Sequence, residues 1–238
     1  MSTYWRKKFE NNFIPTEKKL GLDDILREAQ DAYMGWLGAS LTMFPGDSDE
    51  GQSDDGEVDE AKLNSLNQIY RGEQRVRTTA NDCYDYAING RFKLARNGTE
   101  ETQMNDAWGC LAILVLSARP GIEMFSPRIQ GREMVLPKGL EHILFHALIR
   151  ARLDLDTHPK IDEDALPQLL RQDNTGYLTL KEIALLGQMS ERAVRNAAQP
   201  AAADRLQTRK EQTQTVVDAT EALRWLKGRR GFVVTRAD

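Results

Sequence analysis

Apolar residues recur at intervals of three and four positions through most of residues 1–155. Residues with this spacing lie on one face of a helix, so the pattern predicts amphipathic helices. The expected helices are Leu22–Phe44, Val58–Tyr70, Val76–Ile88, Met104–Ala118 and Leu140–Leu153. Arg119, Pro120 and Gly121 are expected to stop the fourth helix, since proline lacks the amide hydrogen that a helix interior requires. Residues 1–155 are therefore predicted to form a mainly helical domain.

Two segments interrupt this pattern. Residues 46–60 consist almost entirely of Asp, Glu, Gly, Ser and Gln. Such a segment buries too little apolar surface to offset the entropy of ordering it, which predicts a disordered acidic loop. Pro127, Gly131 and Pro137 mark an irregular segment, in which a strand pair is expected around Met134–Leu136.

The chain becomes polar after residue 155. A short helix is expected over Asp162–Leu170, followed by a cluster of turn-forming residues from Asp173 to Gly176. The sequence thus predicts a domain boundary here, between a helical domain of residues 1–155 and a carboxy-terminal domain of residues 161–238.

A pair of short helices is predicted after the turn cluster. Thr179 and Glu182 have the spacing of a capping box at the start of the first helix, and Gly187 with Gln188 ends it. Ser190 is placed to cap the second helix, Glu191–Ala198, which stops before Pro200.

The second helix has an inner and an outer face. Ala193, Val194 and Ala197 form the inner face. Arginine can bond guanine O6 and N7, and Asn or Gln can bond adenine, so an outer face of these types suits the DNA major groove. The outward candidates for base reading are Arg192, Arg195, Asn196 and Gln199.

A β-hairpin and a last helix are predicted next. Leu206–Val217 is rich in Thr, Val and Gln around a charged tip of Arg209, Lys210 and Glu211. Asp218 and Glu221 have capping-box spacing at the start of a helix that runs through Leu226. The candidates for phosphate binding are Ser190, Arg205, Arg209, Lys210, Arg229 and Arg230.

Leu180–Ala197 resembles the helix-turn-helix of bacterial and phage regulators, with Ala184 at the helix contact and Val194 in the core of the second helix. The family's glycine usually sits one position later, where this chain has Gln188 after Gly187. The order of helix pair, hairpin and helix resembles the winged domains of excisionase and MerR-type proteins. This resemblance covers about a quarter of the chain. It implies a mainly α fold, with a helical amino-terminal domain and a carboxy-terminal winged helix-turn-helix that binds double-stranded DNA.

The distribution of charge favours the same reading. The whole chain has a formal net charge of −4. Residues 176–236 contain eleven Lys and Arg and six Asp and Glu, a net charge of about +5, which leaves about −9 for the rest. The basic charge is concentrated where the motif lies.

The sequence predicts a cytoplasmic, nucleoid-associated protein with no membrane partner. Cys83 and Cys110 are far apart and follow no secretory signal, so both are expected as reduced thiols, and Cys83 as a buried, inert one. The longest apolar stretch, Leu111–Leu116, is far too short to span a bilayer.

No enzyme, metal site or cofactor is predicted. His142 and His146 stand four apart on one helix, but their apolar neighbours favour a packing role over metal binding. Asp154, Asp156 and His158 are expected in a solvated turn. The chain has no glycine-rich phosphate loop and no nucleophile elbow.

Three functions stay open at this stage. The first is a sequence-specific transcriptional regulator, a homodimer whose residues 1–155 dimerise, receive a signal or bind a protein partner. The second is an excisionase-like architectural or recombination factor, since one fold serves both uses. The third is a protein-interaction module without DNA binding.

Overall fold

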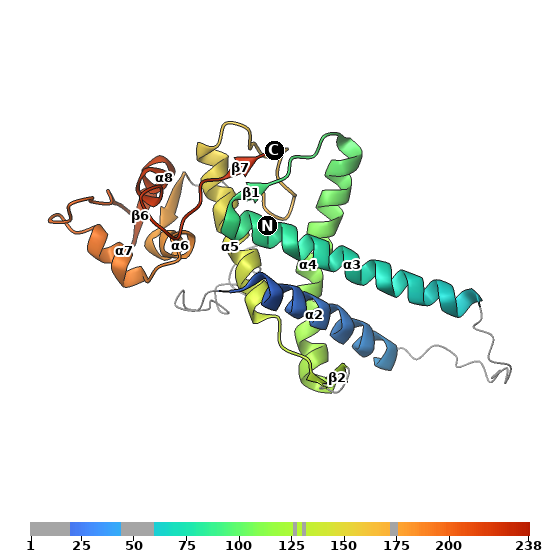
Figure 1. Cartoon of the computed structure of the whole chain (residues 1–238). Coiled ribbons are helices and arrows are strands. Elements are labelled where there is room, and N and C mark those ends of the chain that lie inside the picture. Colours follow the sequence, from blue (N-terminus) through green and yellow to red (C-terminus); the bar gives the residue numbers. More distant parts are fainter. Residues whose placement is uncertain (1–19, 44–59, 126–127, 130–131, 172–175) are drawn as a thin grey trace.

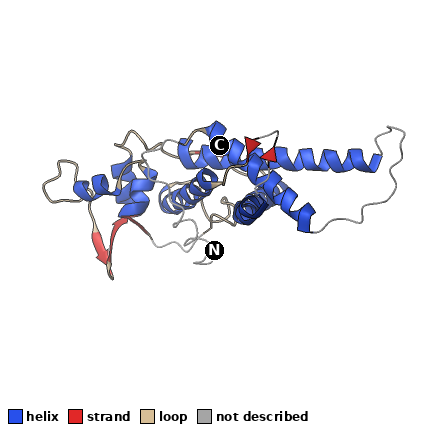
Figure 2. Ribbon diagram, turned by 90° about the horizontal axis from the view of Figure 1, so that it is seen from below, coloured by secondary structure: helices blue, strands red, loops and turns tan. Residues whose placement is uncertain are grey.

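The computed structural model describes residues 20–43, 60–125, 128–129, 132–171 and 176–238. These residues form seven helices and seven short strands, so the predicted mainly helical class is confirmed. In Figure 2 the strands are few and short, and helices make up most of the molecule. The acidic loop expected at 46–60 lies outside the described residues, except for Glu60, which begins a helix.

Helix α2, Leu22–Met43, agrees with its prediction. Asp23 and Asp24 lie in its first turn, where carboxylates are favoured by the helix dipole. Its buried face includes Ile25 and Ala29, both fully inaccessible to solvent. This face packs against α3, α4 and α5.

Helix α3 spans Glu60–Asn89 without a break, so the prediction of two helices is wrong. Gly72 lies between the two predicted helices, where the apolar pattern is interrupted. A Cβ atom built at Gly72 would lie 2.2 Å from the hydroxyl oxygen of Tyr33. The missing side chain therefore lets α3 approach α2, and packing continues the helix where the local pattern weakens.

Helix α4 spans Gly98–Phe125 and continues through Pro120, so the predicted stop is wrong. Ile122, one turn beyond Arg119, is buried. A Cβ atom built at Gly35 would lie 2.7 Å from Ile122 Cγ1, which shows how closely this turn packs on α2. We attribute the continuation to this packing, which opposes the loss of one backbone hydrogen bond at proline.

A small hairpin follows, formed by β2, Arg128–Ile129, and β3, Arg132–Glu133. The strand pair was expected later, around Met134–Leu136, and that placement is wrong. Met134 and Leu136 instead pack against a small buried cluster that joins α2 and α4. Their apolar side chains mark this packing and not a strand.

Helix α5, Lys138–Thr157, is the centre of the molecule (Figure 1). Every residue from Gly139 to Asp154 is buried, so its description as amphipathic is wrong. It contacts α2, α3 and α4, which precede it in the chain, and α6 and α8, which follow it. A helix enclosed by five others needs no solvent-facing stripe, and its charged groups must find partners inside.

Arg150 and Asp154 of α5 meet such partners in one buried cluster. Arg150 donates to the carbonyl oxygens of Ala87 and Val233, at 3.0 and 2.8 Å. Asp154 accepts from the hydroxyls of Tyr86 and Thr235, at 2.9 and 2.8 Å. Asp154 was expected in a solvated turn, and that expectation is wrong because the helix extends past it and packs beneath the carboxy-terminal segment.

The helix expected over Asp162–Leu170 is also wrong, since this segment consists of consecutive turns. Pro167 lies in its middle, where it supplies no amide hydrogen and disfavours helix in the preceding residue. The Leu170 amide donates to the Pro167 carbonyl at 2.8 Å. Ile161 and Leu166 are buried, so the apolar positions pack without forming a helix.

The carboxy-terminal part contains β4, Tyr177–Thr179; α6, Leu180–Leu186; α7, Glu191–Ala197; β5, Arg209–Glu211; β6, Gln214–Asp218; and α8, Ala219–Leu226. Strands β4, β6 and β5 form an antiparallel sheet in that order. In Figure 1 this unit lies at one end of the molecule, and the start of α3 lies at the other.

The last strand, β7, Arg236–Ala237, returns to pair in parallel with β1, Arg91–Phe92. One buried apolar cluster runs from Ile25 on α2 to Ala237 on β7. The division into domains of 1–155 and 161–238 stays a prediction. In the part of the chain that is described, no helix is long and apolar enough to cross a membrane.

Candidate nucleic-acid interface

Helix α6 begins with the predicted capping box. The amide of Glu182 donates to Thr179 Oγ1 at 3.3 Å, and the amide of Thr179 donates to Glu182 Oε2 at 2.7 Å. Two amides that the first turn of a helix leaves unpaired are thus satisfied, so the short helix has a defined start.

Glu182 also anchors α6 to the central helix, a role that the sequence analysis missed. Arg152 of α5 donates to Glu182 Oε1 at 2.6 Å and to the carbonyl of Tyr177 at 2.7 Å. Both side chains are about 5% exposed or less. An arginine and a glutamate thirty positions apart leave no local signal. The pair ties the helix pair to the body of the molecule.

The turn between α6 and α7 uses Gln188 in the left-handed region, with φ of 48°. Gln188 stands where the family that the helix pair resembles usually has its glycine, the residue that adopts a positive φ most easily. Gln188 Nε2 donates to the carbonyl of Gly231 at 2.8 Å, which compensates the strained backbone. A Cβ atom at Gly231 would lie 2.3 Å from the Gly187 carbonyl oxygen, so the turn and the last loop are in close contact.

Helix α7 is capped and anchored as predicted, and it ends one residue earlier, at Ala197. The amide of Ala193 donates to Ser190 Oγ at 3.3 Å. Val194 is fully buried and holds the helix on the core. Ala193 was assigned to the inner face but is exposed, because the short helix rests on Val194 and Ala197 alone.

The four side chains predicted to read bases are all exposed: Arg192, Arg195 and Asn196 on α7, and Gln199 in the turn that follows it. Arg195 donates to Glu191 Oε1 at 2.7 Å, and its side chain is 66% exposed. An exposed pair of this kind is worth at most about 1 kcal/mol, so DNA can displace it at little cost. The helix therefore presents guanidinium and amide groups to solvent.

The predicted hairpin is present as β5 and β6, joined at Gln212 and Thr213. The predicted charged tip is wrong, because Arg209, Lys210 and Glu211 pair with β6 as strand β5 and the tip is uncharged. Lys210 pairs in register with Thr215, and the residues of β5 are all exposed. The guanidinium of Arg209 lies 5.6 Å from the ring centre of Tyr177, so this arginine is held against β4. A basic edge thus projects from the same unit that carries α7.

Helix α8 is capped by Asp218, which accepts from the amide of Thr220 at 2.9 Å. The reciprocal half of the predicted capping box is wrong. Glu221 instead accepts from the amide of Gln207, at 2.9 Å, and pairs with Arg224. The loop before the β5–β6 hairpin packs close to α8, and the Gln207 amide in it takes up the Glu221 carboxylate.

Three of the predicted phosphate-binding arginines differ in their availability. Arg205 and Arg230 are exposed. Arg229 is only 26% exposed, pairs with Asp204 Oδ2 at 2.5 Å and lies 3.9 Å from the ring centre of Trp225. Within the described residues its Nε atom has no hydrogen-bond partner. Arg229 is therefore largely engaged in holding the loop after α7.

Arg224, which the sequence analysis did not single out, belongs to the same cluster. It donates to Asp204 at 3.0 Å and to Glu221 at 2.6 Å. These hydrogen bonds lower the pKa of Asp204 and Glu221 below their ordinary values, with Arg224 the largest cause for both. The spacing of Glu221 and Arg224 is that of a helical ion pair, the one signal that could have found it.

The other candidates lie apart from this unit. Burial lowers the pKa of His142 to about 4 and that of His146 in the same direction, which suits the packing role predicted for them. Cys83 is fully buried and burial raises its pKa, as expected of an inert thiol. No group of His, Cys, Asp and Glu in the described residues has the arrangement of a metal site.

Comparison with family models, with curated proteins and with solved structures finds no match to this chain.

Proposed function

We propose that this chain is a sequence-specific double-stranded DNA-binding regulator of transcription that acts as a homodimer. The observation that carries the proposal is the exposure of Arg192, Arg195 and Asn196 on α7, a capped and anchored helix, and of Gln199 in the turn after it. Each bidentate contact between such a side chain and a base edge contributes about 1–3 kcal/mol of discrimination.

The remaining basic residues of the unit would hold the DNA backbone. Arg209 and Lys210 on the hairpin, with Arg205 and Arg230 in the flanking loops, are exposed. Ser190 lies at the start of α7, where backbone amides can approach a phosphate. Arg229 contributes less directly, because a phosphate would have to compete with Asp204 for its guanidinium.

The dimer follows from the size of the reading element. Helix α7 has seven residues, about two turns, and reaches few base pairs. Two copies on two half-sites one helical turn apart double the contacts and their specificity. We assign dimerisation to residues 1–155, for which the sequence also left open the receipt of a signal or the binding of a protein partner.

The experiment is selection of bound duplexes from a random pool by the full-length protein, at low and at physiological salt. We expect enrichment of a palindromic or repeated motif, with a half-site spacing that reports the dimer. Arg195→Ala should relax the preference at one position of each half-site. Arg236→Ala, an exposed arginine on β7, is the matched control and should leave the motif unchanged.

Binding that disappears with salt and enriches no motif would contradict a sequence-specific regulator. A motif that is the same for Arg195→Ala and the unmodified protein would contradict the base-reading role of that residue. A strong bend in circular-permutation gels, without effect on an adjacent promoter, would favour the architectural role instead.

A further inference from the structure

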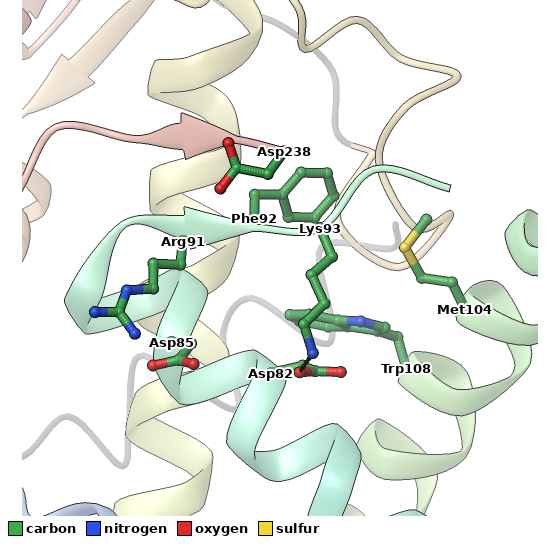
Figure 3. A pocket seen from close by; sticks show the side chains of 8 residues that line it. All are labelled: Asp82, Asp85, Arg91, Phe92, Lys93, Met104, Trp108 and Asp238. Carbon is green, nitrogen blue, oxygen red and sulfur yellow. Dashed lines mark hydrogen bonds and ion pairs between the residues drawn. The ribbon is translucent and has the colours of Figure 1, made fainter. Parts of the chain in front are cut away.

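A depression lies between α3, β1, α4 and the carboxy-terminal strand, far from α7 along the chain (Figure 3). Its main cavity has a volume of about 250 Å³. A second cavity of about 180 Å³ adjoins it and shares Asp82, Lys93, Met104 and Trp108. Together they reach the size of small-molecule sites, roughly 300–1,000 Å³.

Two residues that line both cavities form an ion pair. Lys93 Nζ of the segment after β1 lies 2.6 Å from Asp82 Oδ1 of α3. Figure 3 shows the lysine side chain reaching across the depression beside Trp108. The lysine side chain is 76% exposed, and exposed pairs contribute about 0–1 kcal/mol. The pair can therefore open at little cost.

The lining combines an apolar floor with an excess of acids. Trp108 and Phe92 are each 4% exposed. Asp82 and Asp85 lie one turn apart on α3, and Asp238 lies across β1 from them (Figure 3). All three line the main cavity, and Glu100 lines the second. The basic side chains that line these cavities are Arg91 and Lys93. The lining thus has four carboxylates against two cations.

The two aspartates of α3 retain acceptor capacity. Asp82 Oδ1 accepts from Lys93, and Asp85 Oδ1 accepts from Asn89 Nδ2 at 2.7 Å. An ionised carboxylate has two oxygens and about four lone-pair sites. A ligand ammonium group can therefore be received here, above an indole ring whose face attracts cations.

We propose that this depression binds a small organic cation, an arylalkyl primary amine, whose ammonium group replaces Lys93 Nζ at Asp82. The ring of the ligand lies against Trp108 and Met104, and Asp85 adds a second carboxylate. This site is independent of the proposed DNA binding, because none of its residues belongs to the helix pair or the hairpin. All of its lining residues except Asp238 lie within residues 1–155, for which receipt of a signal was one of the expected roles.

The test is isothermal titration of the full-length protein with tryptamine and, as the matched probe, with indole-3-acetate. The two share a ring and differ in the sign of the charge. We expect tryptamine to bind saturably to one site per chain and indole-3-acetate not to bind. Asp82→Asn should weaken tryptamine binding by at least about tenfold, since a charge-assisted hydrogen bond is lost.

Lys93→Met gives the sharper result. Removing the competing ammonium should strengthen tryptamine binding by about two- to fivefold. The Lys93 side chain is exposed, so its replacement should not disturb folding. The test therefore stays valid even if Asp82→Asn unfolds. Asp106→Asn, an exposed acid on α4 outside both cavities, should change nothing.

Equal affinity for the two probes would overturn the proposal, as would the absence of saturable tryptamine binding. A Lys93→Met variant that binds tryptamine no better than the unmodified protein would show that Asp82 is not the ammonium site.

Discussion

Glu28 is a carboxyl group enclosed where α2 meets the start of α5. Its Oε2 accepts from the amide of Leu140 at 2.8 Å. Burial is the largest cause of a shift that raises its pKa from 4.5 to about 7. The folded protein therefore holds this proton more tightly than the unfolded chain does.

The raised pKa predicts a pH-dependent loss of stability. The contribution of Glu28 is fully present below pH 4.5 and falls as the pH rises through about 7, where the folded protein must ionise it. Glu28→Gln keeps an acceptor for Leu140 but cannot ionise. Between pH 4.5 and pH 8 the variant should gain on the order of 2 kcal/mol in unfolding free energy relative to the unmodified protein.

Urea unfolding of both proteins at the two pH values measures this difference. His142, whose lowered pKa acts in the opposite sense, is present in both proteins and cancels. A difference that is the same at pH 4.5 and pH 8 would show that Glu28 titrates normally.

Gly231 is a residue whose missing side chain matters for the turn of the helix pair. A Cβ atom there would lie 2.3 Å from the Gly187 carbonyl oxygen and 3.0 Å from Gln188 Cβ. Gly231→Ala should therefore destabilise the protein by about 1–3 kcal/mol. Gly109→Ala is the control, because nothing lies within 4 Å of the added atom and alanine favours a helix interior by about 1 kcal/mol.

Thermal unfolding by circular dichroism checks both variants. We expect a lower midpoint for Gly231→Ala and a higher one for Gly109→Ala. If Gly231→Ala unfolds at the same temperature as the unmodified protein, the loop and the turn are not in the close contact described.

The β5–β6 hairpin has two exposed basic residues, Arg209 and Lys210, next to each other on β5. Replacing both Arg209 and Lys210 by alanine should remove two phosphate contacts. The slope of log binding constant against log salt should then become shallower by about 1.8, at about 0.9 per phosphate. The preferred motif should not change, because phosphate contacts carry no sequence information directly.

Fluorescence anisotropy with the selected duplex at several salt concentrations measures the slope. Lys160→Ala, an exposed lysine in the turns after α5, is the control. An unchanged slope for the double variant would mean that the hairpin does not contact the backbone of the DNA.

Helix α5 shows why the sequence pattern of a helix can wrongly predict a face exposed to solvent. Helix α5 contains Arg150, Arg152 and Asp154, and such charges normally mark a solvent face. Here each is buried and bonded to a group more than twenty positions away. Exposure was therefore decided by what packs around the helix and not by its composition.

At the scale of the molecule, the carboxy-terminal segment joins the helix pair to the helical body. Thr235 donates to Asp154 and accepts from Arg150 Nη1 at 3.0 Å. The carbonyl of Asp238 accepts from the amide of Leu94 at 2.8 Å. The partners of the segment, Arg150, Asp154 and Leu94, all precede it by more than eighty positions.

Deletion of residues 235–238 should lower the free energy of unfolding by about 3–5 kcal/mol, because Arg150 and Asp154 lose a shared partner in the interior. Urea unfolding followed by circular dichroism and by tryptophan fluorescence measures it. The milder Thr235→Val, which keeps the backbone pairing of β7, should cost less. Equal stability of the deleted and the full chain would show that the segment adds nothing to the folded state.

The sequence by itself determined the features stabilised within a few positions. These are the ranges of α2, α6, α7 and α8 to within about a residue, the Thr179–Glu182 capping box, the Ser190 cap and the hairpin beyond Leu206, together with the exposure of Arg192, Arg195 and Asn196 on α7. A cap or a two-residue turn involves atoms that the chain already holds close, so the residues that make it stand together in the sequence.

The tertiary structure decided what depends on distant partners. It continued α3 through Gly72 and α4 through Pro120, enclosed α5, and turned Arg229 towards Asp204. It also paired Arg152 with Glu182 and assembled the depression around Asp82 from four elements. These contacts join groups that only folding brings together, and the free energy of burying them outweighs local preference.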